Sequence, residues 1–185
     1  MSVDIEIIDN FLEQHYFEIL KKSLTGNRFP WFNCADVVNK ELNSEYCDEK
    51  YNWQLFHLFY YNPLEISDAI NILDPLLTKI NPMMLLKAKA NLNPVGEKII
   101  EHGMHIDTYP LELADLLTTS IFYINTNNGY TLLEDGTKIE SIENRLISFP
   151  ATTKHTGTNC TDVQNRIVLN LNYIKRPKNA TYAGH

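Results

Sequence analysis

Hydrophobic and polar residues repeat with a helical period in two segments of the first half of the chain, residues 9–23 and residues 66–80. The second of these segments stops at an Asn-Pro pair, which disfavours a continuing helix. Between them, residues 25–51 are rich in Asn and charge and predict loops, whereas residues 53–61 are aromatic on both faces of a strand. The first half is therefore predicted to mix helices, loops and a strand.

From residue 84 onward the period changes from helical spacing to the alternation of strands. The predicted strands are residues 84–93, 97–107, 118–125, 130–133, 138–142, 146–149 and 165–174. Turn sequences at Asn127-Asn128-Gly129 and Glu134-Asp135-Gly136 separate some of them. This rhythm is typical of a jelly roll.

We therefore expect a mainly β fold with N-terminal helices and a double-stranded β-helix (jelly-roll) core. A length of 185 residues with 44% hydrophobic content is enough for one core and predicts a single domain, residues 1–185. Its parts are expected to be a helical and mixed N-terminal support over residues 1–83, the jelly-roll core over 84–175, and a mobile tail over 176–185.

The predicted strand at residues 165–174 carries an arginine on its more polar face. Its two faces are Arg166, Val168, Asn170 and Asn172, and Ile167, Leu169, Leu171 and Tyr173. If the apolar face packs on a second layer, Arg166 points into a lined cavity. A buried guanidinium needs an anion, and a dicarboxylate cosubstrate would supply one through two parallel hydrogen bonds.

A metal site is indicated by His105 and Asp107, because side chains two residues apart on a strand point to the same face. His155 follows in a polar turn, residues 151–158, at the edge of a strand. Two histidines and one carboxylate are the ligands that favour non-haem Fe(II). His102 lies three residues before His105 and is expected to point away from it. Each histidine alone could be a surface or core residue, so the prediction depends on the combination.

At these positions the chain resembles the 2-oxoglutarate and Fe(II)-dependent dioxygenases, and specifically their prolyl 4-hydroxylase-like branch. The resemblance covers roughly residues 5–174, and its matching segments are residues 8–12, 103–107, 122–125, 129–131, 144–149, 155–157 and 166–170. It implies that His105, Asp107 and His155 hold Fe(II) and are the catalytic centre. It also implies that Arg166 pairs with the distal carboxylate of 2-oxoglutarate, and that Tyr123 hydrogen-bonds the same carboxylate.

Two positions depart from related sequences. Relatives often carry a tyrosine just before a proline near the cosubstrate, where this chain has Asn93 before Pro94. The nucleic-acid demethylase branch carries a second arginine six residues beyond the first, where this chain has Asn172. The second departure argues against a DNA-repair function.

The resemblance implies an enzyme that uses Fe(II), 2-oxoglutarate and molecular oxygen to hydroxylate a C–H bond, with release of succinate and CO2. The expected substrate is a peptidyl residue such as proline, with a free small molecule as the alternative. Trp31 and Tyr109 lie in loop-like stretches where they could contact it. Two other classes stay open: a jelly-roll binding or structural protein with a vestigial metal site, and a cupin-like metal enzyme such as a sugar isomerase.

Charge and composition limit the partners and the cellular location that we expect for this protein. A formal net charge of −7 argues against a general nucleic-acid-binding surface. The N-terminal residues lack the pattern of a signal peptide, and no apolar run is long enough to cross a bilayer, so we expect a soluble, cytoplasmic protein without membrane contact. The cysteines Cys34, Cys47 and Cys160 are an odd number without CxxC spacing and predict reduced thiols. The sequence does not indicate an oligomeric state.

Overall fold

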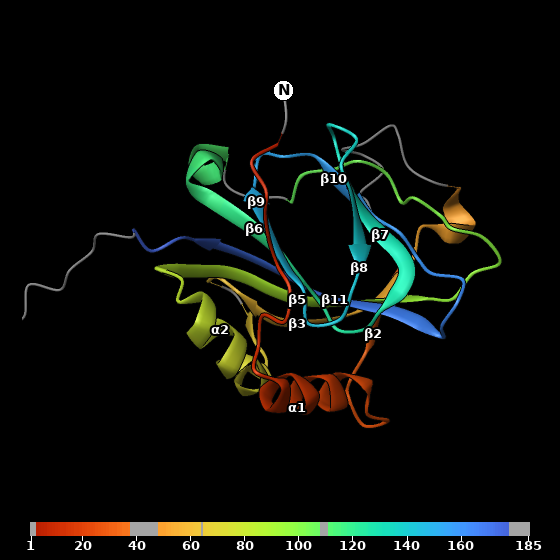
Figure 1. Ribbon diagram of the computed structural model, residues 1–185, viewed down its shortest axis with the longest axis horizontal. Coiled ribbons are helices and arrows are strands. Elements are labelled where there is room, and N and C mark those ends of the chain that lie inside the picture. The colour runs from red at the N-terminus through yellow and green to blue at the C-terminus, as the bar shows by residue number, and fades with distance from the viewer. Residues whose placement is uncertain (1–2, 38–47, 64, 108–110, 178–185) are drawn as a thin grey trace, which may run out of the picture.

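The computed structural model describes residues 3–37, 48–63, 65–107 and 111–177, which form a large and a small β-sheet with helices behind the large one (Figure 1). The predicted roles of Cys47 and Tyr109 lie outside the described residues, as does most of the predicted tail. The architecture is mainly β with antiparallel pairing, and is consistent with a jelly-roll core.

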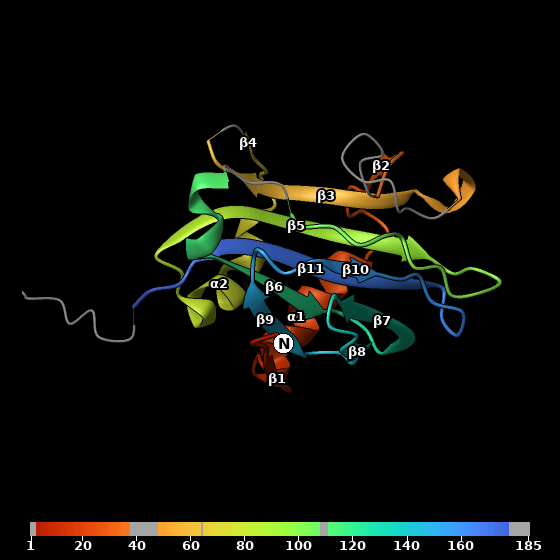
Figure 2. The ribbon, with the colours of Figure 1, turned by 90° about the horizontal axis from the view of Figure 1, so that it is seen from above.

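The large sheet contains eight antiparallel strands. They are β1 (Glu6–Ile8), β2 (Phe32–Cys34), β3 (Gln54–Tyr61), β4 (Glu65–Ile66), β5 (Met84–Pro94), β6 (Leu117–Tyr123), β9 (Leu146–Pro150) and β11 (Asn165–Ile174). Their order is β1-β9-β6-β11-β5-β3-β2, and β4 pairs with β3. Figure 2 shows the long strands β3, β5 and β11 running side by side through the middle of the molecule.

The small sheet has the order β10-β7-β8 and lies on the other side of the large sheet from the helices (Figure 1). Its strands are β7 (Asn127–Leu133), β8 (Lys138–Ser141) and β10 (His155–Gly157). Strands of both sheets line one pocket, so the two sheets together position the site described below.

Two α-helices among the described residues, α1 (Gln14–Thr25) and α2 (Asp74–Ile80), cover one face of the large sheet. Three short 3-10 helices complete this part of the fold: η1 (Glu49–Tyr51), η2 (Ile70–Leu73) and η3 (Leu111–Leu116). Phe17 of α1 and Leu76 of α2 are fully buried against the sheet. Burying a side chain of this size contributes about 1.5–3 kcal/mol. The apolar stripe of α1 therefore explains why it docks on the sheet.

Strand β11 has the alternation that the sequence predicts. Ile167, Leu169 and Leu171 belong to the core beneath the helices, while Arg166 and Asn170 line the pocket on the opposite face. The second layer under the apolar face consists of helices, and this arrangement leaves the polar face of the central strands directed at the small sheet.

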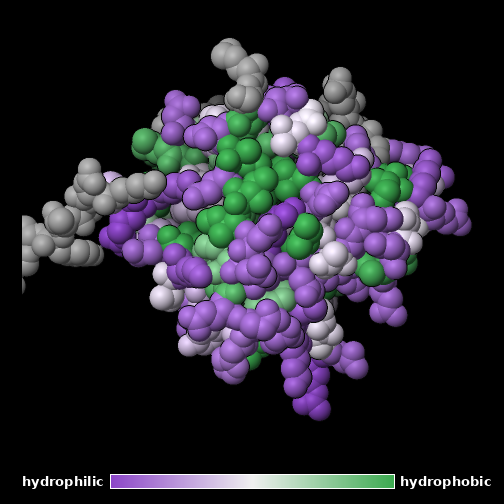
Figure 3. Space-filling view, in the orientation of Figure 1, coloured by the Kyte–Doolittle hydropathy of each residue, from purple (hydrophilic) through white to green (hydrophobic). Residues whose placement is uncertain are grey.

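The edge strand β1 was not expected from the sequence. It pairs with β9, and its residues Ile7 and Ile8 are exposed. Figure 3 shows hydrophobic side chains gathered in the middle of the face seen in Figure 1.

Among the described residues, no helix is long and apolar enough to cross a membrane. Cys34 and Cys160 carry free thiols.

Several predicted elements differ from the structure. Residues 97–107 do not form a strand, and only isolated bridges at Glu101 and His105 pair there, in a segment where Gly103 has a φ of 117°. The first helix begins at Gln14, not at residue 9, because Asn10 has a φ of 51° and breaks the helical path. Strand β10 begins at His155, within the stretch predicted as a turn.

Candidate active site

Three potential metal ligands meet at one end of the pocket. His105 and Asp107 come from the extended segment before η3, and His155 is the first residue of β10. One ligand atom from each of these residues lies within 4.8 Å of the other two. Asp107 and His155 are buried and His105 is half-buried. The structure therefore brings together the three residues that the sequence singled out.

The two imidazole rings are held in a fixed orientation. Nδ1 of His105 donates to the carbonyl oxygen of Gly103 at 3.0 Å, and Nδ1 of His155 donates to that of Thr153 at 3.2 Å. Because a carbonyl oxygen only accepts, each Nδ1 carries a proton, and in the neutral ring the lone pair is then on Nε2. Burial also lowers the pKa of His155, which favours its neutral form. This is the state in which imidazoles bind metal ions.

The carboxylate of Asp107 is anchored from β11. Asn172 donates to its Oδ2 at 2.9 Å and Asn170 to its Oδ1 at 3.4 Å, while the Lys87 ammonium lies 3.8 Å from Oδ1. Burial alone would raise the pKa of Asp107, but Lys87, the two nearby histidines and the Asn172 hydrogen bond together hold it well below its usual range. An ionised, buried carboxylate beside two imidazoles fits a divalent transition metal.

At the other end of the pocket, Arg166 is 2% exposed. Its Nε donates to Ser141 at 2.8 Å, Nη1 to the Thr158 carbonyl at 3.3 Å and Nη2 to Thr131 at 3.2 Å. All three acceptors are neutral, and no carboxylate of the described residues lies within ion-pair distance. Burial lowers the pKa of Arg166. A buried guanidinium held only by neutral oxygens has a strong affinity for an anion.

Tyr123 supports this arginine from behind. It is fully buried, its hydroxyl donates to Thr131 at 2.8 Å, and its ring lies 5.6 Å from the Arg166 guanidinium carbon. Thr131 lines the pocket, whereas Tyr123 does not. Thr131 thus joins both residues in one hydrogen-bond network. Its role was not predicted from the sequence, although residues 129–131 resemble the dioxygenase family.

Gly129 is required for this arrangement by close approach. A β-carbon at this position would clash with the backbone carbonyl oxygen of Asn159, and it would lie 2.6 Å from Cδ of Arg166 and 2.8 Å from Oδ1 of Asn127. Its amide also donates to Asn127 Oδ1. Any larger residue would therefore push the Arg166 side chain out of its place.

His102 lines the pocket, which corrects the expectation that it points away from His105. It is 4% exposed and lies 3.4 Å from the Asn93 amide nitrogen, and burial, Arg166 and His105 lower its pKa to about 4. The alternation argument fails because residues 97–107 are not a regular strand.

Asn93 also lines the pocket and contacts Gln54. Trp31 packs on Phe29 and the helix-side core instead of lining this pocket.

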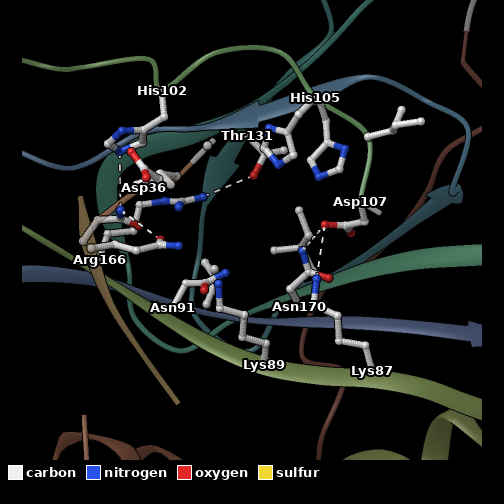
Figure 4. A pocket seen from close by; sticks show the side chains of 18 residues that line it. Asp36, Lys87, Lys89, Asn91, His102, His105, Asp107, Thr131, Arg166 and Asn170 are labelled. Atoms are coloured by element: carbon white, nitrogen blue, oxygen red, sulfur yellow. Dashed lines mark hydrogen bonds and ion pairs between the residues drawn. The ribbon is translucent and has the colours of Figure 1, made fainter. Parts of the chain in front are cut away.

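The floor of the pocket comes from β5. Lys87, Lys89, Asn91 and Asn93 all line the pocket, and the backbone register pairs Lys89 with Asn170 and Asn93 with Arg166 (Figure 4). The two lysines were not predicted as site residues from the sequence. The sequence feature that could have identified them is the alternation of polar and apolar residues from Lys87 to Asn93, which directs every polar side chain to one face of the strand. The cavity between these residues has a volume of about 270 Å³.

No protein-family model matches the sequence, and no curated protein does either. Solved structures do match. A prolyl hydroxylase from Trichoplax adhaerens, in complex with a hypoxia inducible factor peptide fragment, has a TM-score of 0.62 at 18% identity, over 94% of this chain and 84% of its own. A prolyl-4-hydroxylase from Pseudomonas putida has a TM-score of 0.54 at 14% identity, over 95% and 94%. The chain has the fold of these oxygenases.

The same fold occurs in an enzyme of another activity. The non-heme alpha ketoglutarate dependent epimerase SnoN from nogalamycin biosynthesis has a TM-score of 0.63 at 12% identity, over 97% of this chain and 83% of its own. The resemblance inferred from the sequence is thus confirmed for the fold, and the site residues carry the argument for function.

Proposed function

We propose that this protein is an Fe(II)- and 2-oxoglutarate-dependent dioxygenase. The observation that carries the proposal is the pairing, in one pocket, of a His-Asp-His cluster with a buried arginine that has no carboxylate partner among the described residues. A binding or structural protein would have no need to keep a buried guanidinium and three convergent metal ligands at opposite ends of one cavity. The fold of the solved oxygenases supports the same proposal.

The proposed roles follow from the geometry. His105, Asp107 and His155 would hold Fe(II) through the two Nε2 atoms and a carboxylate oxygen, which leaves other coordination positions open. Arg166 would pair with the distal carboxylate of 2-oxoglutarate, with Thr131 at its side and Tyr123 behind it. When bound, the iron would couple decarboxylation of 2-oxoglutarate by O2 to hydroxylation of a C–H bond, giving succinate, CO2 and the alcohol.

The protein side chains would fix where this chemistry takes place. The hydrogen bonds that the two imidazoles donate to the Gly103 and Thr153 carbonyls favour one tautomer of each ring, and Asn172 keeps the Asp107 carboxylate from rotating. Around Arg166, burial excludes water, which strengthens its attraction for a carboxylate. The neutral His102 adds no competing charge near that end of the pocket.

The substrate proposed from the branch resemblance is a peptidyl residue such as proline, with a free small molecule as the alternative. Among the similar structures, the Trichoplax adhaerens enzyme is in complex with a peptide fragment, and SnoN belongs to nogalamycin biosynthesis. Both substrate types are therefore compatible with this fold.

Formation of succinate from 2-oxoglutarate tests the proposal. We expect the native protein to form succinate slowly when it is supplied with Fe(II) and O2, even without a substrate, and His155→Ala to form none. The control His15→Gln changes an exposed residue of α1 and should match the native protein. Equal succinate formation by the native protein and His155→Ala would contradict the proposal.

A further inference from the structure

The pocket contains more positive charge than the proposed metal and cosubstrate require. Among the described residues that line it, the permanent charges are the cations Lys87, Lys89 and Arg166 and the carboxylates Asp36 and Asp107. A divalent metal and a doubly charged 2-oxoglutarate cancel each other. Among these described residues, one positive charge is therefore not matched by an anion.

Among the described residues that line the pocket, Lys89 is the cation that this count leaves without an anionic partner. Arg166 faces the proposed cosubstrate, and Lys87 lies 3.8 Å from Asp107. Lys89 is half-buried, and its ammonium lies 5.0 Å from the centre of the Phe56 ring but makes no ion pair with a described residue. Burial and the neighbouring Lys87 lower its pKa by more than Cys34 and the Asp107 carboxylate raise it.

The position of Lys89 is between the two ends of the pocket. The backbone register places it opposite Asn170, whose amide group donates to the Asp107 carboxylate. Because this bond fixes the orientation of the amide, Oδ1 of Asn170 is a buried acceptor with no donor. Figure 4 shows Lys89 and Asn170 in the same part of the pocket, near Lys87. A cation and a free acceptor there fit a ligand that has both an anionic group and a hydrogen-bond donor.

The size of the cavity limits that ligand. Small-molecule sites usually have about 300–1,000 Å³, and this cavity has about 270 Å³ before a cosubstrate takes its share. Inside this cavity there is therefore room only for a small unit that carries both the anionic group and the C–H bond to be oxidised.

We propose that the substrate is a small amino or hydroxy carboxylic acid, whose carboxylate binds Lys89 and whose N–H or O–H group donates to Asn170. This inference rests on the proposed function, because it assigns the substrate of the same site. It selects the free small molecule over the peptidyl proline, which has no charge to offer a lysine.

Binding of inorganic phosphate tests the Lys89 subsite without turnover. The protein would be loaded with Zn(II) and 2-oxoglutarate, which occupies Arg166, and titrated with phosphate. We expect saturable binding that weakens at least about tenfold in Lys89→Met, a change of about 1.4 kcal/mol. Lys22→Met removes an exposed lysine of α1 and should bind phosphate as the native protein does. Absence of saturable binding, or unchanged binding in Lys89→Met, would overturn the proposal.

The affinity for 2-oxoglutarate separates this proposal from the proposed function. If the native protein fails to bind 2-oxoglutarate, the proposed function fails, while the difference in phosphate binding between the native protein and Lys89→Met still reports on Lys89. If Lys89→Met weakens 2-oxoglutarate binding as much as Arg166→Ala does, Lys89 serves the cosubstrate and the substrate assignment is wrong.

Matched substrates provide the second measurement. Free amino and hydroxy acids and their carboxamides, which lack the negative charge, would be compared as stimulators of succinate formation. We expect at least one free acid to stimulate and its carboxamide to have no effect, and Lys89→Met to lose the difference between them. Stimulation by carboxamides or by a neutral proline peptide, with none by the acids, would overturn the proposal.

Discussion

His105 and His155 are joined by two reciprocal backbone hydrogen bonds, each amide donating to the other residue's carbonyl oxygen at 2.9 Å. Their ring centroids lie 4.9 Å apart as a result. Residues opposite each other in an antiparallel pair project their side chains to the same side. The backbone itself therefore sets the spacing of the two imidazoles, although they are fifty residues apart in the sequence.

This pairing predicts that the histidine side chains can be changed without loss of the fold. His105→Gln and His155→Gln should each lower the affinity for Co(II) by more than about 100-fold. Substitution of a residue that only supports a ligand typically costs less, about 10–100-fold. Their circular dichroism spectra should match that of the native protein, because the bridge uses only backbone atoms. Titration with Co(II) checks the prediction, and native affinity in either variant would refute it.

Asn172 is predicted to be a positioning residue for the metal site. Its amide donates to Asp107 Oδ2 at 2.9 Å and to Thr119 at 3.0 Å. Asn172→Leu should weaken Co(II) binding by about 10–100-fold, since loss of an outer hydrogen bond leaves the carboxylate free to rotate. The Co(II) absorption spectrum should also change, which a merely structural effect would not cause. An unchanged spectrum and affinity would show that Asn172 does not orient Asp107.

Gly129→Ala is predicted to displace Arg166 without harming the metal ligands. The new methyl group would clash with the backbone carbonyl oxygen of Asn159 and would lie 2.6 Å from Cδ of Arg166, so both the local backbone and the arginine side chain must shift. We expect at least about a tenfold loss of 2-oxoglutarate affinity, or 1.4 kcal/mol, with native Co(II) binding. Gly136→Ala is the control, because nothing lies within 4 Å of its new methyl group; its φ of 88° strains an alanine, so this variant can lose stability without touching Arg166. Equal 2-oxoglutarate affinities in the two variants would contradict this account.

Asn144 is predicted to stabilise the start of the chain. Its side chain accepts from the Leu12 amide at 2.8 Å and donates to the Leu12 carbonyl at 2.9 Å, and its φ is 58°. Asn144→Ala should lower the free energy of unfolding by about 2–4 kcal/mol, from two buried hydrogen bonds and a strained φ. Asn144→Gly relieves the strain and should lose roughly 1 kcal/mol less. Urea unfolding measures both, and an Ala variant as stable as the native protein would refute the prediction.

The sequence predicted those parts of the fold and site that depend on local periodicity. Strand β11 is an example, because alternation alone divides Arg166 and Asn170 from Ile167 and Leu169. Short strands such as β1 and β10 have too few residues for a period to be recognised, and their pairing partners lie far away in the sequence.

Other parts of the site depend on tertiary contacts that local patterns do not contain. His102 enters the pocket because its segment follows an irregular path past Gly103. Lys89 was visible as a polar residue in an alternating strand, but only the packing of both sheets shows that this polar face is enclosed. The assignment of the metal ligands from sequence rested on resemblance, and the structure adds the distances between them.

Anaerobic titration of the Fe(II)-loaded protein with 2-oxoglutarate tests the central claim most directly, because the weak visible metal-to-ligand absorption reports on both ends of the pocket. We expect a saturable band in the native protein and a much weaker affinity in Arg166→Ala. Arg166→Lys should be intermediate, because it keeps the charge but loses the planar fork. Absence of the band in the native protein, or an equal affinity in Arg166→Ala, would contradict the account.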